Sequence, residues 1–300
     1  MKLLITGAFN CSEAELKALS DSGNEITFMQ NESDSLPCKY DEVEGIICNG
    51  LFLHHPIEKF TSLRYIQLTS AGFDRVPMDY IKEKGIKINN AKGVYSVPMA
   101  EFALCGALDL YKRSRFFAEN QKAHKWEKCR NLFELSGKTV SIVGCGSVGS
   151  ECAKRFKGFD ASVFAVDIKK PESPYFDKFF PLEKIKEALD ASDIIILTLP
   201  LTDKTKNMFS EELFSCFKKN CVLINIARGA IVSEKALIKA LQNGTLYGAV
   251  LDVFENEPLS DDSPLWDMQN VILTPHNSFV GEGNKERLYK LIVNNLSQAN

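Results

Sequence analysis

The sequence lacks the features of a membrane or nucleic-acid-binding protein. Its 300 residues contain no apolar run that approaches the roughly 18 residues of a membrane span. A net charge of −3 gives no electrostatic reason to expect binding to nucleic acid. The start, Met1-Lys-Leu-Leu-Ile, has no long apolar core and no small-residue cleavage site, so no signal peptide is expected.

The cysteines form no pattern that predicts disulfides or a zinc site. There are nine, an odd number, and none belongs to a Cys-x-x-Cys pair. Several, among them Cys48, Cys105 and Cys221, lie inside apolar runs, which is typical of buried free thiols in a reducing compartment. We therefore expect a cytoplasmic protein with no metal site, no membrane contact and no nucleic-acid partner.

The sequence does contain a glycine-rich turn between two apolar, β-branched runs. Gly144, Gly146 and Gly149 follow the first run with G-x-G-x-x-G spacing, and Asp167 ends the second run 18 positions later. Strand, turn, helix, strand and acid in this order predict a dinucleotide-binding unit. Gly144 permits a tight turn, Gly146 lets a pyrophosphate approach the backbone, and Gly149 lets the helix pack on the strand. The alternative is a glycine-rich turn in another kind of α/β protein.

Short apolar runs alternate with helical patterns, which predicts an α/β fold of two doubly wound parallel sheets with helices on both faces. A long periodic segment, 96 to about 123, is predicted to be a single helix. We expect a substrate domain from residues 1–93 with about 277–300, and a dinucleotide-binding domain from residues 94–276. The expected strands are 2–6, 25–29, 45–48, 65–69 and 86–89 in the first domain, and 140–143, 162–167, 194–199, 221–226, 247–252 and 271–273 in the second.

Charged side chains follow three successive predicted strands of the second domain. Arg228 follows the first, an acidic turn that includes Glu257 follows the next, and His276 follows the last. The carboxyl ends of parallel strands face the ligand crevice of such sheets, so these groups are expected to converge near the nicotinamide of a bound dinucleotide. Each also has a simpler interpretation: a solvated arginine, a polar turn and an ordinary loop histidine.

On these motifs, the chain resembles the D-isomer-specific 2-hydroxyacid dehydrogenases from about Leu68 onward. The resemblance implies a Rossmann NAD-binding domain, a smaller flavodoxin-like substrate domain, and hydride transfer between NAD(H) and a D-2-hydroxyacid or 2-ketoacid. The pieces that carry it, in the order of the family, are Thr69-Ser70-Ala71-Gly72-Phe73-Asp74, the segment from Gly93 to Glu101, the glycine turn, Leu199-Pro200-Leu-Thr202 with Thr205, Asn225-Ile-Ala-Arg228-Gly229, the segment from Asp252 to Pro258, and Thr274-Pro275-His276.

The resemblance also implies roles for individual residues. His276 would be the general acid–base, Glu257 would orient its ring, and Arg228 would polarise the substrate carbonyl and bind the carboxylate. The backbone of Ser70, Ala71 and Gly72 would bind the same carboxylate. The cofactor would be held by Gly144, Gly146, Ser147, Val148, Gly149, Asp167, Pro200, Thr205, Ala227 and Asp252.

Asp167 predicts a preference for NAD(H) over NADP(H). A carboxylate near the adenosine ribose accepts hydrogen bonds from two hydroxyls and repels a 2′-phosphate. Lys169 and Lys170 follow closely, and their positive charge would soften this preference.

The segment His124-Lys125-Trp126 is similar to one that commonly contributes to a two-fold dimer in the family, so we predict a homodimer. The alternative is a tryptophan that only closes an apolar edge. Two other functions stay open at this point. One is an NAD(H)-sensing regulatory protein on the same fold without turnover. The other is a formate dehydrogenase, although the Pro275-His276 context lacks the neighbouring glutamine arrangement of that enzyme.

Overall fold

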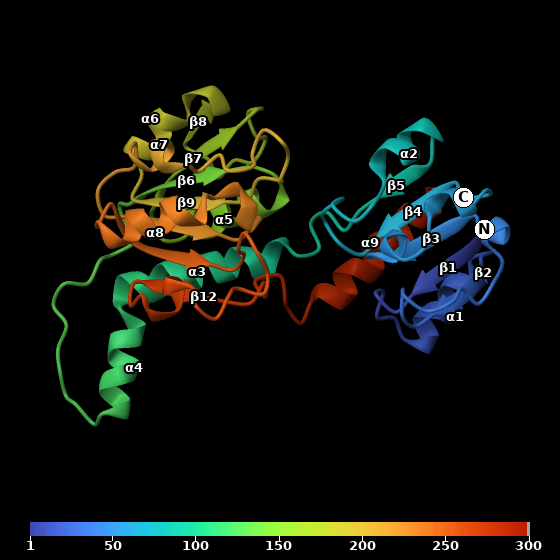
Figure 1. Ribbon diagram of the computed structural model, residues 1–300, viewed down its shortest axis with the longest axis horizontal. Coiled ribbons are helices and arrows are strands. Elements are labelled where there is room, and N and C mark those ends of the chain that lie inside the picture. The colour runs from blue at the N-terminus through green and yellow to red at the C-terminus, as the bar shows by residue number, and fades with distance from the viewer. Residues whose placement is uncertain (299–300) are drawn as a thin grey trace. The chain divides into compact units, whose positions relative to one another are not determined.

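The computed structural model describes residues 1–298, which divide into two compact units (Figure 1). Unit 1 comprises Met1–Tyr95 with Gly281–Asn300, and unit 2 comprises Ser96–Val280. Each unit is built on one sheet. The divisions lie two and four residues beyond those expected from the sequence, at 95 rather than 93 and at 280 rather than 276.

Unit 2 contains a seven-stranded parallel sheet in the order β12-β11-β10-β9-β6-β7-β8. The chain builds outward from β6 in one direction and then crosses to β9, which makes the carboxyl ends of β6 and β9 the topological switch point. The strands are β6 (Thr139–Val143), β7 (Ser162–Asp167), β8 (Lys178–Pro181), β9 (Ile194–Leu197), β10 (Cys221–Asn225), β11 (Leu246–Leu251) and β12 (Val271–Leu273). The helices are α3 (Ser96–Lys112), α4 (Ser114–Lys122), α5 (Ser147–Lys157), α6 (Ile185–Asp190), α7 (Glu211–Phe214) and α8 (Glu234–Gln242), with short 3₁₀ turns at Leu182–Lys184, Gly229–Ile231 and Pro264–Asp267.

Helices cover both faces of this sheet because successive strand residues point to opposite sides and nearly all are apolar. Ile142 and Ile196 pack on one face in a core shared with α3 and α5. Val143 and Leu197 pack on the other face with α6, α7 and α8. The sheet is therefore a buried platform, and the loops at its carboxyl edge are the parts free to carry chemistry.

The predicted single helix from 96 to about 123 is wrong. Helix α3 ends at Lys112, Arg113 adopts a left-handed conformation with φ 52°, and α4 starts at Ser114. Because a left-handed residue redirects the chain, the two segments cannot form one rod. Helix α4 has no buried residue and extends away from the sheet of unit 2 (Figure 1), so its periodic pattern does not reflect packing within the chain.

Unit 1 contains a five-stranded parallel sheet in the order β2-β1-β3-β4-β5, the flavodoxin-like order. Its strands are β1 (Lys2–Thr6), β2 (Glu25–Met29), β3 (Gly45–Cys48), β4 (Tyr65–Leu68) and β5 (Lys87–Asn89). Its helices are α1 (Glu13–Asp21), α2 (Met78–Glu83) and α9 (Asn284–Ser297), with 3₁₀ turns at Tyr40–Glu42, Leu51–Leu53 and Ile57–Lys59. Ser12 begins α1 with a capping box to Glu15.

Helix α9 joins unit 1 although it comes from the other end of the chain. Its Leu288, Ile292 and Leu296 are buried in one core with Leu3 and Ile5 of β1. The apolar residues recur every four positions, so a single stripe of the helix faces the sheet. The two ends of the chain thus share one hydrophobic core.

Two further expectations can be compared with the fold. Cys48 and Cys221 are buried, but Cys105 is exposed, so its predicted burial is wrong. Cys105 lies on α3 beside the buried stripe that runs through Ala103 and Ala107, and a run of apolar letters does not resolve the two sides of a helix. Within residues 1–298, no helix combines the length and the apolar character needed to cross a membrane.

Candidate active site

Three adjacent strands of unit 2 deliver the predicted catalytic side chains to one edge. Strands β10, β11 and β12 are neighbours and all parallel, so their carboxyl ends lie together. Arg228 follows β10, Glu257 follows β11, and His276 follows β12. This is the edge at which open α/β sheets bind ligands.

His276 and Glu257 form a directly bonded pair. His276 Nδ1 lies 2.8 Å from Glu257 Oε2, and the two side chains are 41% and 36% exposed. An ionised carboxylate only accepts hydrogen bonds, so Nδ1 carries the hydrogen and Nε2 is the nitrogen available to another molecule. The second carboxylate oxygen of Glu257 accepts the Phe254 N–H at 3.1 Å, which fixes the carboxylate on its own turn.

A buried aspartate holds the loop that carries His276. Asp252 is completely buried, and its carboxylate accepts hydrogen bonds from the Thr274 hydroxyl at 2.7 Å and from the Asn277 and Ser278 N–H groups at 2.7 and 2.9 Å. The carbonyl of Asp252 accepts the His276 N–H at 2.8 Å. These contacts stabilise a backbone in which His276 itself has φ 51°, a conformation that a histidine seldom adopts. Asp252, which was predicted to contact the cofactor, therefore positions the backbone of His276.

The arginine loop after β10 is equally constrained. Asn225, 1% exposed, accepts the Ala227 N–H at 3.1 Å and donates to the Arg228 carbonyl at 3.2 Å, which shapes the turn that presents the arginine. Arg228 is half-buried, and its Nη1 donates to the Ala227 carbonyl at 2.8 Å. A Cβ on Gly229 would lie 1.8 Å from the Phe254 backbone, so only glycine allows this loop to pack on the loop that carries Glu257.

The glycine turn has the geometry needed for a dinucleotide. Gly144 has φ 94°, and a Cβ on Gly149 would lie 2.2 Å from the Gly144 carbonyl oxygen, so helix α5 packs against the turn as expected. Gly146 precedes α5, and the position of its missing Cβ has no atom within 4 Å among the described residues. The residues thus fit a pyrophosphate at the N-terminus of α5, where Ser147 and Val148 form the first turn.

Asp167 ends β7 beside the glycine turn. Its carboxylate accepts the Cys145 N–H at 2.5 Å and the Ile168 N–H at 2.6 Å. Each carboxylate oxygen has a further lone pair, so both backbone contacts can persist while ribose hydroxyls bind. Burial, with Asp167 nearby, raises the pKa of the Cys145 thiol to about 12, so this cysteine stays protonated and unreactive.

The remaining predicted cofactor residues also lie at this edge of unit 2. Pro200 follows β9 and is exposed, and Ala227 is 6% exposed. The Thr205 hydroxyl donates to the Pro200 carbonyl at 2.7 Å and accepts the Thr202 N–H at 2.8 Å. Thr205 therefore stabilises the turn after β9 through hydrogen bonds within the loop.

Ser70, Ala71 and Gly72 belong to unit 1 and follow β4. Ser70 and Gly72 are half-buried and Ala71 is exposed. Within residues 1–298, no protein acceptor receives the N–H of Ala71 or of Gly72. Two adjacent amides without an internal partner can bind an anion such as a carboxylate.

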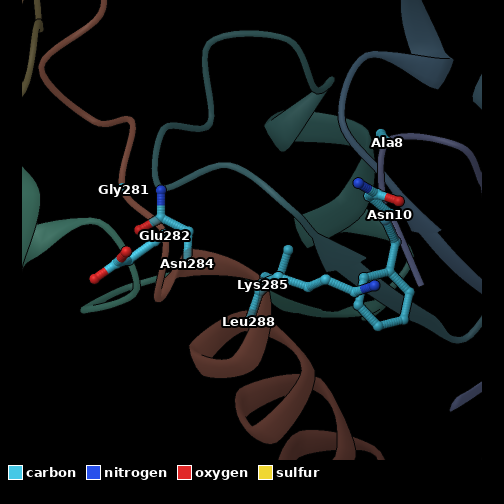
Figure 2. Close-up of a pocket in the computed structure, with 8 residues that line it drawn as sticks. Ala8, Asn10, Gly281, Glu282, Asn284, Lys285 and Leu288 are labelled. Atoms are coloured by element: carbon cyan, nitrogen blue, oxygen red, sulfur yellow. The ribbon is translucent and has the colours of Figure 1, made fainter. Parts of the chain in front are cut away.

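Unit 1 also contains a cavity of about 250 Å³ that is formed by other residues than the predicted site. It is bounded by the loop after β1, with Ala8 and Asn10, and by the start of α9, with Lys285 and Leu288 (Figure 2). Lys285 Nζ forms an ion pair with Glu15 Oε2 at 3.7 Å. None of the predicted site residues lines the cavity. No group of three or more His, Cys, Asp or Glu within residues 1–298 could hold a metal ion.

Comparison with known proteins assigns the family. The family described as "D-isomer specific 2-hydroxyacid dehydrogenase, NAD binding domain" matches residues 104–278. The chain belongs to the D-isomer specific 2-hydroxyacid dehydrogenases. A glyoxylate reductase from Korarchaeum cryptofilum is 33% identical to this chain over 249 residues, which are 80% of this chain and 74% of that protein.

Solved structures extend the likeness to nearly the whole chain. A D-lactate dehydrogenase from Aquifex aeolicus, complexed with NAD and lactic acid, has a TM-score of 0.79 and 27% identity and covers 99% of this chain and 94% of its own. A family member from Xanthobacter autotrophicus Py2, in complex with NADPH and MES, has a TM-score of 0.80 and 25% identity with the same coverage, 99% and 94%. The predicted family and fold class are confirmed, and the family supports NAD-linked oxidoreduction of hydroxyacids and ketoacids.

Sequence reasoning missed the residues that shape these loops. Asn225 and the Phe254 N–H orient the arginine and the glutamate through contacts that no spacing rule describes. The only sequence signal was an asparagine at the end of a fully apolar strand, since a buried amide is retained only where its hydrogen bonds are satisfied.

Proposed function

We propose that the protein is an NAD(H)-dependent D-2-hydroxyacid dehydrogenase that reduces a small 2-ketoacid, with His276 as its acid–base group. The observation that carries the proposal is the 2.8 Å contact between His276 Nδ1 and Glu257 Oε2. In this chain, the pair and the glycine turn follow strands of the same sheet, and the chain belongs to a family of NAD-linked dehydrogenases. Such a pair presents a histidine with one nitrogen fixed and the other available for proton transfer.

In the proposed reduction, a bound nicotinamide supplies a hydride to the carbonyl carbon. His276 Nε2 gives its proton to the carbonyl oxygen, so that the C=O bond becomes an alcohol, and in oxidation the same nitrogen takes the hydroxyl proton. Glu257 accepts the Nδ1 hydrogen and stabilises the charged ring. Proton transfer of this kind contributes about 10²–10⁴-fold to the rate.

The substrate carboxylate has two proposed partners. The Arg228 guanidinium can donate two parallel hydrogen bonds to it, and the amides of Ala71 and Gly72 have no competing protein acceptor within residues 1–298. Arg228 belongs to unit 2 and the amides to unit 1, so variants of each test their roles separately.

The experiment that tests this function follows NADH absorbance with a panel of 2-ketoacids. The panel contains glyoxylate, hydroxypyruvate, pyruvate, branched 2-ketoacids and 3-phosphohydroxypyruvate. Oxidation of NADH by at least one of them supports the proposal. Tight NADH binding without turnover of any panel member contradicts it and favours an NAD(H)-sensing regulator.

A His276→Ala variant tests the assignment of the acid–base group. We expect kcat to fall by about 100-fold or more, because no other group would exchange the proton. The dissociation constant of NADH, measured by fluorescence, should stay unchanged. A variant that keeps its kcat would contradict the role of His276.

We further propose that NAD(H) is preferred over NADP(H). The support is Asp167, whose carboxylate lies beside the glycine turn and would repel a 2′-phosphate. Because one solved relative binds NADPH, the preference needs its own test. It predicts a higher kcat/KM with NADH than with NADPH, and equal or better use of NADPH would refute it.

We also propose that the protein is a homodimer and that it is located in the cytoplasm, a reducing compartment. Trp126 is 96% exposed, and Phe117 of α4 and Leu132 are 39% and 36% exposed, so three apolar side chains of the segment 117–132 are available for a second copy to cover. The nine cysteines are all free, as expected where thiols stay reduced. Light scattering at micromolar concentration that detects only monomers would refute the dimer.

A further inference from the structure

The loop after β4 is held by the segment that follows β5. The Ser70 carbonyl accepts the Ala91 N–H at 2.8 Å, and the Ala71 carbonyl accepts Nδ2 of Asn90 at 2.6 Å. Strands β4 and β5 are adjacent and parallel, so the two loops leave the sheet side by side. Consecutive carbonyl groups of one loop therefore point at one neighbouring segment.

A third contact continues this pattern. The hydroxyl of Tyr95, four residues beyond Ala91, donates to the Thr69 carbonyl. Burial raises the pKa of Tyr95, so its phenol remains a hydrogen-bond donor at neutral pH. Segment 90–95 thus supplies one donor to each of three successive carbonyls.

These contacts set the direction of the amide groups. A peptide unit is planar and trans, so its C=O and its N–H point in opposite directions. The Ser70 carbonyl shares a peptide with the Ala71 N–H, and the Ala71 carbonyl shares one with the Gly72 N–H. When both carbonyls bond to segment 90–95, both N–H groups must point away from it, where no acceptor within residues 1–298 receives them.

Asn90 is the only side chain that holds the Ala71–Gly72 peptide in this orientation, among the described residues. Its own orientation is set from the other end, because Oδ1 accepts the Lys92 N–H at 3.2 Å. The amide oxygen therefore faces a donor and the amide nitrogen faces an acceptor. An aspartate at this position would keep the first contact and turn an oxygen toward the carbonyl of Ala71.

We infer that Asn90 is a positioning residue for the substrate carboxylate, because its amide directs the Gly72 N–H, next to that of Ala71, at the anion. This inference rests on the proposed function, in which these amides bind the carboxylate of a 2-ketoacid. Asn90 itself does not touch the substrate. Its loss should weaken substrate binding and leave cofactor binding intact.

The test compares Asn90→Ala and Asn90→Asp with the wild-type protein on the best 2-ketoacid of the panel. Losing the hydrogen bond to the Ala71 carbonyl should raise KM, and the inhibition constant of the carboxylate probe oxamate, by about 2- to 10-fold in Asn90→Ala. Asn90→Asp should raise both further, since it adds repulsion against the Ala71 carbonyl. The dissociation constant of NADH should match the wild type, and the Tm should fall by no more than about 6 °C, as the loss of a hydrogen bond on a loop implies.

Asn243→Asp is a matched control in unit 2. Its side-chain oxygen also accepts an N–H two residues ahead, from Thr245 at 3.0 Å, and the substitution keeps that contact. It should leave KM, the oxamate constant and kcat unchanged.

The results separate the two proposals. Wild-type turnover with wild-type KM in Asn90→Ala overturns the inference alone. So does a fall in kcat with no change in KM, or an Asn90→Asp variant that binds substrate better than Asn90→Ala. A wild-type protein that reduces no panel member overturns the proposed function, and the inference with it.

Discussion

Replacing Glu257 with glutamine should impair the proton transfer of His276 while preserving the structure around it. Glutamine has nearly the same size, and its oxygen can still accept the Phe254 N–H now bound at 3.1 Å. Its NH₂ group would then face His276 Nδ1, which also carries a hydrogen. One of the two must change, so the ring adopts the other tautomer and loses the carboxylate that stabilises its protonated form.

The size of the effect follows from the contact. A hydrogen bond to a charged group contributes about 1.5–3 kcal/mol, and exposure of more than a third of both side chains places this one in the lower part of that range. About 1.5–2 kcal/mol corresponds to a fall in kcat of about 10- to 30-fold. The assay is NADH oxidation at saturating ketoacid, with NADH affinity and Tm measured in parallel and expected to stay unchanged.

Glu255→Gln is the matched control. Glu255 lies on the same turn as Glu257, and its carboxylate accepts the Glu234 N–H at 2.7 Å. No hydrogen bond or ion pair within residues 1–298 joins it to His276. It should keep a wild-type kcat. Adding Glu257→Gln to His276→Ala should cost nothing further if Glu257 acts through the ring. A Glu257→Gln enzyme within about twofold of wild-type kcat, which corresponds to only about 0.4 kcal/mol, would refute the reasoning.

Three further predictions address other parts of unit 2. Arg228→Lys should lower kcat/KM for the ketoacid by about 10- to 100-fold although the charge is kept, because an ammonium cannot make the bidentate contact; near-normal kcat/KM would contradict this. Gly229→Ala should lower stability by about 1–3 kcal/mol, since its Cβ would lie 1.8 Å from backbone, whereas Gly146→Ala, with no atom within 4 Å, should keep its Tm and weaken NADH binding. Burial raises the pKa of Asp193, but the Lys218 ammonium and a backbone N–H outweigh it and hold that pKa below its ordinary value. The ionised carboxylate thus stabilises the fold above the unfolded-state pKa of about 3.9 and less as pH falls through the folded-state value, so Asp193→Asn should lower the Tm at pH 7 and by a smaller margin below pH 4.

The parts of the fold that could be predicted are those encoded by local spacing. The glycine triplet and Asp167 belong to one strand–turn–helix–strand unit, so their spacing alone predicts the dinucleotide turn. Buried strands can be predicted because they appear as apolar runs. The predicted strand ends at 69 and 199 extended one and two residues too far, because the β-branched Thr69 and Thr198 continue the strand pattern where the turn already begins. Strand β8 (Lys178–Pro181) was missed, since four residues that end at a proline give little pattern.

The site was predicted in part for the same reason. Arg228, Glu257 and His276 could be assigned to one edge because parallel strands bring their carboxyl ends together. The contacts of Asp252 and Asn90 could not, since each depends on the detailed course of a loop with no repeating pattern. The break at Arg113 was also hidden, because the helical pattern continues across a residue whose left-handed conformation only the fold reveals.

The position of α9 has a consequence for biosynthesis. Its Ile292 and Leu296 complete the core over β1, yet they emerge from the ribosome after every residue of unit 2. Unit 2 can therefore fold before α9 is available to complete the core of unit 1. Until α9 has left the ribosome, the face of the N-terminal sheet that carries Leu3 and Ile5 is covered only in part and can bind chaperones.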